Sequence, residues 1–134
     1  MYEIDTTDFS LNFEPYIDHG AFGDKNIERL RVQVTSYGFS ADATMNVDKK
    51  WLADFAKELN EFYEKLEGGA ALEEYKGHSK ITFSFTTGGH IHVMGWLYKE
   101  QNSHGQKLSF SNSIDQTELR DFAKSLYRAL CETK

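Results

Sequence analysis

The chain has 134 residues, of which 21 are acidic and 15 are basic, giving a formal net charge of −6. This length predicts a single domain over residues 1–134, large enough to bury a hydrophobic core without disulfide bonds. The charge disfavours nucleic acid as a partner because phosphates would repel it, and no apolar stretch approaches the ~18 residues of a membrane span.

Residues 1–26 are predicted to be an irregular segment with one possible edge strand, to which Ile4, Phe9, Leu11 and Phe13 would contribute the apolar side chains. The segment is acidic at its start and lacks the apolar stretch of a signal peptide, so we expect a cytoplasmic protein. The single cysteine, Cys131, agrees with a reducing compartment because it allows no internal disulfide.

A clear alternation of apolar and polar residues begins at Glu28. It continues to Thr35, and a second alternating series runs from Phe39 to Val47. Two such segments joined by Tyr37-Gly38 predict a β-hairpin in which each strand has one buried side.

A long amphipathic helix is predicted next. Apolar residues recur at helical spacing from Trp51 to Leu66, and Asp48 precedes them as the expected N-cap. Gly68-Gly69 is expected to end the helix because glycine readily adopts the left-handed conformation of a helix C-terminus.

Strands are expected again after the helix, including a short one at Leu72–Tyr75. Residues 81–85 and 91–97 alternate, and Gly88-Gly89 between them predicts a hairpin turn. A polar loop is expected at residues 101–106 before the last strand.

The last helix is predicted to begin after Asp115, which forms a capping box with Glu118. Its segment Leu119–Leu126 matches Leu52–Leu59 of the first helix in six of eight positions, as the sequence shows. Two explanations stay open: an old duplication of a strand–strand–helix unit, or convergence of amphipathic helices that pack on a sheet.

These elements predict an α+β fold, with an antiparallel sheet of about six strands formed by residues 27–134. Two amphipathic helices are expected to cover one face of the sheet and to leave the other face open. The residues expected on the open face are Arg31, Gln33, Asp42, Thr44, Thr82, Ser84, His92, Met94, Trp96 and Tyr98.

The sharpest candidate for chemistry is the pair His90 and His92, because residues i and i+2 of a strand point to the same side. A metal site would need a third ligand, and the sequence does not secure one. Motifs for nucleophilic catalysis or phosphate binding are missing. We therefore expect no catalytic residues, no metal and no cofactor.

Several short segments occur in a distinctive order: Val32-Gln33-Val34, Ser40–Ala43, the helix Trp51–Leu59, Ile81–Phe83, Gly89–Leu97 and the closing helix Leu119–Leu130. In this order the chain from Arg31 to Leu130 resembles the WapI-type immunity proteins of bacterial polymorphic toxin systems. The resemblance implies a cytoplasmic, non-enzymatic protein without a cofactor. It also implies binding to a cognate toxin domain, often a nuclease, whose active site is shielded.

The expected partner-binding residues are the open-face aromatics Trp96 and Tyr98, then His92, with Glu73 and Glu74 as acidic contacts. Trp and Tyr are enriched at protein interfaces, which favours this choice. Two alternatives stay open. One is a small metal- or ligand-binding enzyme that uses His90 and His92, and the other is a homodimeric structural domain that buries the open face against a second copy.

Overall fold

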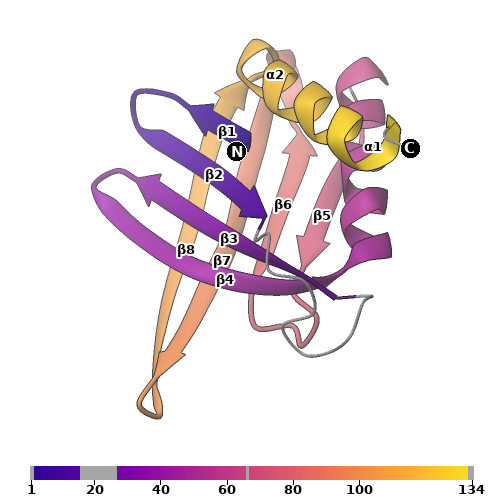
Figure 1. Cartoon of the computed structure of the whole chain (residues 1–134). Helices are drawn as coiled ribbons and strands as arrows, with labels where there is room; N and C mark the ends of the chain where they lie inside the picture. Colours follow the sequence, from indigo (N-terminus) through magenta and orange to yellow (C-terminus); the bar gives the residue numbers. More distant parts are fainter. Residues whose placement is uncertain (1, 16–26, 66, 133–134) are drawn as a thin grey trace.

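The computed structural model describes residues 2–15, 27–65 and 67–132, and in these residues the strands form two antiparallel sheets of four strands each. The first sheet contains β1 (Tyr2–Asp5), β2 (Phe9–Pro15), β3 (Ile27–Ser36) and β4 (Phe39–Asp48). The second contains β5 (Gly69–Glu73), β6 (Lys80–Phe85), β7 (His90–Gln101) and β8 (His104–Asp115). In each sheet the strands lie side by side in chain order (Figure 1).

Each sheet is followed in the chain by one helix. Helix α1 (Lys49–Lys65) begins where the Asp48 carboxylate accepts a 2.8 Å hydrogen bond from the Lys50 N–H, as the predicted N-cap requires. Helix α2 (Gln116–Tyr127) begins with the predicted capping box, in which Glu118 accepts a hydrogen bond from the Asp115 N–H. Two short helical turns, η1 (Thr87–Gly89) and η2 (Arg128–Glu132), complete the elements.

The prediction of a single sheet of about six strands is wrong, although the α+β class is confirmed. Alternation indicates which side of a strand is buried, but it does not indicate which strand lies next to it. After α1 the chain starts a second sheet at Gly69 and does not extend the first.

Two local predictions also need correction. The first residues form a regular hairpin of β1 and β2, with Ile4 opposite Leu11, while residues 16–26 lie outside the described part of the chain. The expected polar loop at 101–106 belongs to a long hairpin, because β7 and β8 pair without interruption as far as Gln101 and His104. Only Asn102 and Ser103 form the turn, and both have positive φ.

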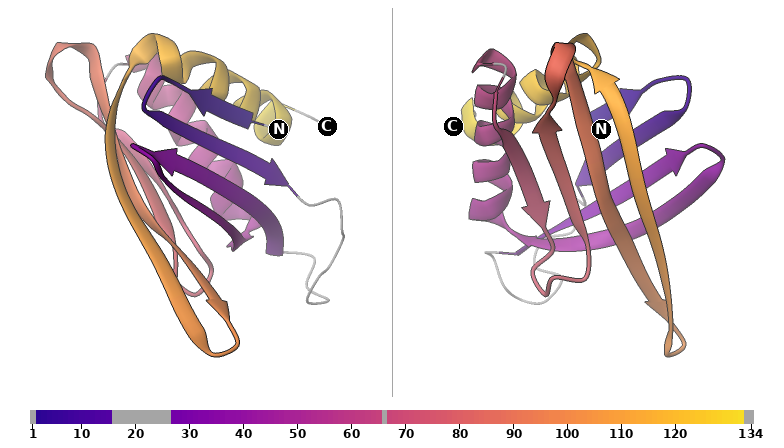
Figure 2. Two further views of the ribbon diagram at one scale, coloured as in Figure 1. Left: turned by 90° about the vertical axis from the view of Figure 1, so that its left-hand side faces the viewer. Right: turned by 180° about the vertical axis from the view of Figure 1, so that it is seen from behind.

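The two sheets enclose the hydrophobic core together with the helices (Figure 1). They approach each other where β4 meets β7 and β8, and the helices fill the space on the other side (Figures 1 and 2). Helix α1 packs beside β5, the first strand of the second sheet, and α2 packs beside β1, the first strand of the first sheet. Each helix therefore contacts the sheet that lies in the other half of the chain.

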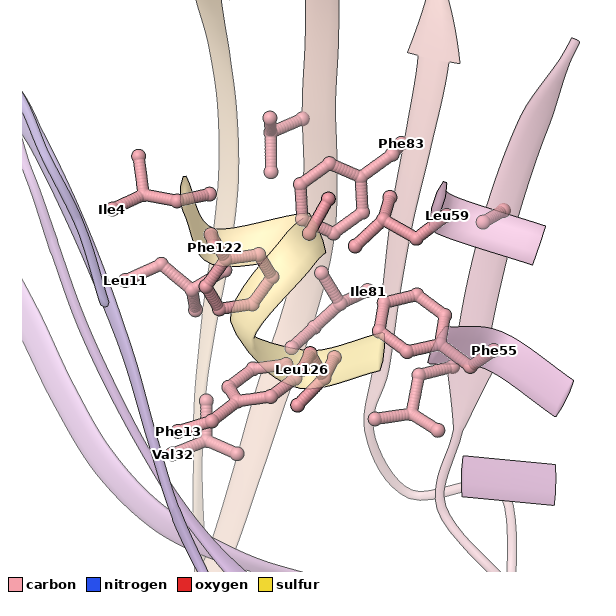
Figure 3. Packing of buried hydrophobic residues seen from close by; sticks show 14 of the residues in the cluster. Ile4, Leu11, Phe13, Val32, Phe55, Leu59, Ile81, Phe83, Phe122 and Leu126 are labelled. Atoms are coloured by element: carbon pink, nitrogen blue, oxygen red, sulfur yellow. The ribbon is translucent and has the colours of Figure 1, made fainter. Parts of the chain in front are cut away.

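Four phenylalanine rings meet at the centre of the core (Figure 3). Phe13 on β2 lies 5.2 Å from Phe122 on α2 and 6.3 Å from Phe55 on α1, measured between ring centroids. Phe83 on β6 contacts the same two helix rings at 6.1 and 6.0 Å. Phe55 and Phe122 also occupy equivalent places in the segment that the two helices share. In each half of the chain, four strands are followed by one helix. A duplicated unit would produce this repeated order and the equivalent positions of the two rings.

Candidate functional site: the outer face of the second sheet

The second sheet turns one side toward the core and the other toward solvent (Figure 2, right). On β7 the buried residues Ile91, Val93 and Leu97 alternate with residues of the outer side. The outer face of the second sheet is formed by Ala71, Glu73, Lys80, Thr82, Ser84, His92, Met94, Trp96, Tyr98, Lys107, Ser109, Ser111 and Ser113.

The predicted open face is divided between the two sheets. Its first four residues, Arg31, Gln33, Asp42 and Thr44, lie on the outer side of the first sheet. The other six, from Thr82 to Tyr98, lie on the second sheet. The prediction that Arg31 and Trp96 share one open face is therefore wrong.

Trp96 lies in the middle of the outer face. It pairs across the sheet with Lys80 on β6 and Ser109 on β8, and its side chain is half-buried. The Lys107 ammonium lies 5.2 Å from the centroid of the Trp96 ring, a distance suited to a cation–π contact. Next to it along β7, Met94 is 44% exposed between the short side chains of Thr82 and Ser111. The large side chains of Trp96 and Met94 thus lie among small polar side chains.

Tyr98 is held in place by its neighbours. Its backbone N–H donates a 3.0 Å hydrogen bond to Ser79 Oγ, and its ring lies 5.4 Å from the His78 ring. Across the hairpin, a Cβ atom on Gly105 would lie 2.5 Å from the Tyr98 hydroxyl oxygen. The absence of a side chain at Gly105 is what gives the Tyr98 ring its position over β8.

His92 joins β7 to β8 through a 2.6 Å hydrogen bond between its Nε2 and Ser111 Oγ. His90 also lies on the outer side of β7, as the spacing predicts, and is exposed. In the described residues, no three His, Cys, Asp or Glu side chains gather in a way that could hold a metal ion. The geometry therefore gives no support to the alternative in which these two histidines form a metal site.

The two predicted acidic contacts differ in their surroundings. Glu73 ends β5 and is exposed at the border of the outer face. Glu74 is only 7% exposed, and its carboxylate accepts a hydrogen bond from the His78 N–H at 3.1 Å. Because the Glu74 carboxylate stabilises the turn between β5 and β6, it does not belong to the proposed contact surface.

The outer side of the first sheet is polar and charged. Arg31 on β3 donates hydrogen bonds to both carboxylate oxygens of Asp42 on β4, at 3.1 and 2.7 Å, and lies 3.7 Å from Glu14. The hydrogen bonds from Arg31 are the main reason that the pKa of Asp42 is lowered. Among the described residues, this face offers ion pairs but none of the exposed large apolar groups of the second sheet.

Two surface features were not singled out by the sequence. Tyr37, in the turn between β3 and β4, is 67% exposed, and Phe39, the first residue of β4, is 68% exposed. Beside them lies the turn between β1 and β2 with the exposed Asp5 and Asp8, and the Tyr37 N–H donates a hydrogen bond to the Asp8 carbonyl oxygen. The pair Tyr37-Gly38 did indicate a turn, but alternation alone placed Phe39 on the buried side of its strand.

In the described residues, no helix is long and apolar enough to cross a membrane. A comparison with curated proteins finds no match. The model of the immunity protein WapI-like family matches residues 3–132, which cover both sheets and both helices.

Proposed function

The chain belongs to the WapI-like immunity protein family, and from this premise we propose that it neutralises a cognate toxin domain by binding it directly. The family match is the observation that carries the proposal. Neutralisation would be steric, because a toxin whose substrate cleft is covered by another protein cannot reach its substrate.

We propose the outer face of the second sheet as the contact surface, centred on Trp96, Tyr98 and His92 and bordered by Glu73. Trp, Tyr and Met are enriched in the buried centre of interfaces and carry much of the binding energy there. The Ser, Thr and Ala residues around them have short side chains, so a partner can approach the sheet closely. The neighbouring strands already fix the rings of Trp96 and Tyr98, which lowers the entropy lost on binding.

The net charge of −6 favours a basic partner. A nuclease domain fits this requirement because its active site must attract phosphates. Electrostatic steering would raise the association rate at low salt, and the affinity would fall as salt screens the charges. We further propose that the encounter takes place in the cytoplasm, where a nuclease finds its substrates.

The test is to co-express the chain with the toxin domain encoded beside its gene. We expect restored growth and a stable complex of the two purified proteins. If growth is not restored and no complex forms, the proposed function is wrong.

A substitution tests the contact surface. Replacing Trp96 by Ala is expected to cost about 2–4 kcal/mol of binding free energy, roughly 30- to 1000-fold in Kd, measured by titration calorimetry. The matched control is Trp51→Ala, since Trp51 is 48% exposed and belongs to α1 and not to the second sheet. Circular dichroism would verify that both variants are folded. Equal affinities for the two variants would contradict the choice of surface.

A further inference from the structure

The edge of the second sheet along β8 differs from the other sheet edges. Helix α1 packs beside the edge strand β5, α2 packs beside β1, and β4 meets the β7–β8 hairpin. In the described residues, β8 pairs with β7 alone, and its other side runs along the margin of the sheet (Figure 2). Backbone N–H and C=O groups on that side lack a neighbouring strand.

The hairpin geometry identifies these groups. In an antiparallel pair, residues alternate between pointing their backbone groups toward the partner strand and away from it. The two-residue turn after Gln101 sets the phase, and Tyr98 agrees with it, because its N–H points away from β8 to Ser79. On β8 the backbone groups of Ser109, Ser111 and Ser113 therefore point to the open edge.

This edge lacks the features by which proteins usually prevent strand addition, which are charged residues, proline and β-bulges. From Leu108 to Ile114 the strand contains no charged residue and no proline, and its register with β7 is unbroken. The side chains of the three serines are short and lie on the outer face, so they do not screen the edge.

The turns of the first sheet lie next to the middle of β8. Ser36 hydrogen-bonds to Asn112, and the Phe9 ring stacks on Phe110 at 6.2 Å between centroids. One residue beyond Ser36 begins the exposed aromatic pair Tyr37 and Phe39. Tyr37 has a φ of 51°, a conformation that costs a bulky residue about 1 kcal/mol or more. A strand laid along β8 would find these two rings beside it, together with Asp5 and Asp8.

We propose that β8 receives an extended, basic segment of the toxin domain as a fifth strand of the second sheet. Backbone hydrogen bonds to Ser109, Ser111 and Ser113 would hold the segment, and Asp5 and Asp8 would pair with its basic side chains. Pairing of β8 with a second copy of the chain is disfavoured by charge, because each copy carries a net charge of −6 and has Asp5 and Asp8 at the turn between β1 and β2. The inference rests on the proposed function, since it takes the toxin as the partner.

Proline at position 111 tests the edge directly. Ser111→Pro removes the N–H at the centre of the open edge but leaves the hydrogen bonds to β7 intact, and proline is tolerated at such edge positions. We expect at least a tenfold weaker Kd for the toxin, equivalent to about 1.4 kcal/mol. The variant Ser111→Ala keeps the N–H and loses the hydroxyl bonded to His92, so it measures the share of the side chain, and its Kd should rise clearly less than that of Ser111→Pro.

Hydrogen exchange on the unmodified protein provides a test that does not depend on the folding of a variant. The amides of Ser109, Ser111 and Ser113 should exchange rapidly in the free protein and slowly in the complex. The amides of Phe110 and Asn112, which face β7, should be protected in both states. If the toxin binds and the three serine amides continue to exchange rapidly, strand addition is wrong while the proposed function stands. If no toxin binds, the proposed function itself fails.

Two further measurements test whether a basic segment of the toxin or a second copy of the chain pairs with β8. Asp5→Asn combined with Asp8→Asn should weaken binding at low salt and reduce its salt dependence, and an unchanged salt dependence would contradict a basic segment at this edge. Light scattering of the free protein should show a monomer. A dimer whose serine amides are already protected would overturn the proposal in favour of a second copy.

Discussion

Asp42 is the residue whose charge the structure perturbs most clearly. It accepts two hydrogen bonds from Arg31, and these lower its pKa below the ordinary value of 3.8. A carboxylate whose pKa is lowered in the folded state adds stability above its unfolded pKa, and this contribution disappears as the pH falls through the folded pKa. The pair is partly exposed, with side-chain exposures of 40% and 45%, so solvent screens it and its contribution is modest.

The replacement Asp42→Asn should therefore lower the free energy of unfolding at pH 7 by less than about 1 kcal/mol. The difference from wild type should be constant from pH 7 down to about 5 and should shrink as the pH is lowered below about 4. Urea denaturation at several pH values would measure it. A difference that grows in acid would contradict the role assigned to Arg31.

At the residue scale, alternation was sufficient to place Trp96, Tyr98 and His92 on an outer face. Glu74 continues the alternation in which Ala70 and Leu72 are buried, and its side chain is buried as well, so the choice of this residue as an acidic contact disregarded the pattern. Helical spacing failed for Trp51, which fits the apolar stripe but lies exposed in the first turn of α1. This second error falls at the end of an element, where a periodic pattern no longer applies.

Between elements, a buried polar pair connects the two sheets. Ser36 at the end of β3 is 8% exposed and Asn112 on β8 is 6% exposed, and Ser36 Oγ lies 3.0 Å from Asn112 Nδ2 and 3.2 Å from Oδ1. A buried amide that loses its partner pays the full cost of desolvation, so the pair acts as a unit.

Replacing Ser36 by Ala should cost about 1–3 kcal/mol of unfolding free energy, because the Asn112 amide stays buried without this partner. In the double variant Ser36→Ala and Asn112→Leu the unpaired amide is gone, so the loss should be smaller than the sum of the two single losses. Thermal and urea unfolding of the four proteins would give the coupling energy. Strict additivity would show that the two side chains do not depend on each other.

The β3–β4 and β6–β7 hairpins and both helices could be predicted because each is a local pattern with its own start and stop signals. The capping box at Asp115 and Glu118 and the turn at Gly88-Gly89 are examples. The hairpin of β1 and β2 was missed because its turn contains threonines and no glycine, and because alternation covers only a few residues. The division into two sheets could not be predicted, since it depends on contacts between residues far apart in the chain.

At the scale of the whole molecule, the core depends on each helix packing against the sheet that the other half of the chain forms. Phe122 on α2 contacts Phe13 of the first sheet and Phe83 of the second, and it is 1% exposed. Since α1 and α2 also contact each other, through the Lys124–Glu64 ion pair among other contacts, loosening one helix should loosen both sheets.

Phe122→Ala should therefore cost about 3–5 kcal/mol, a large share of the stability of a domain of this size. The loss should affect both sheets in one cooperative transition, which hydrogen exchange of β2 and β6 amides would detect. The control Phe39→Ala removes an equally large ring that is 68% exposed, and its effect on stability should be small. Selective loss of protection in one sheet would contradict the shared core.

The position of α2 beside β1 has a consequence for the newly made chain. All of β2 to β8 and α1 lie between β1 and α2 in the sequence, so the ribosome releases α2, which packs beside β1, only after these elements. At translation rates of roughly 5–20 residues per second, several seconds pass between the synthesis of the first sheet and that of α2. Until then the side of β1 that α2 covers in the folded protein is exposed. During that interval the nascent chain is open to mispairing, and a chaperone that shields this strand until α2 emerges should raise the yield of folded protein.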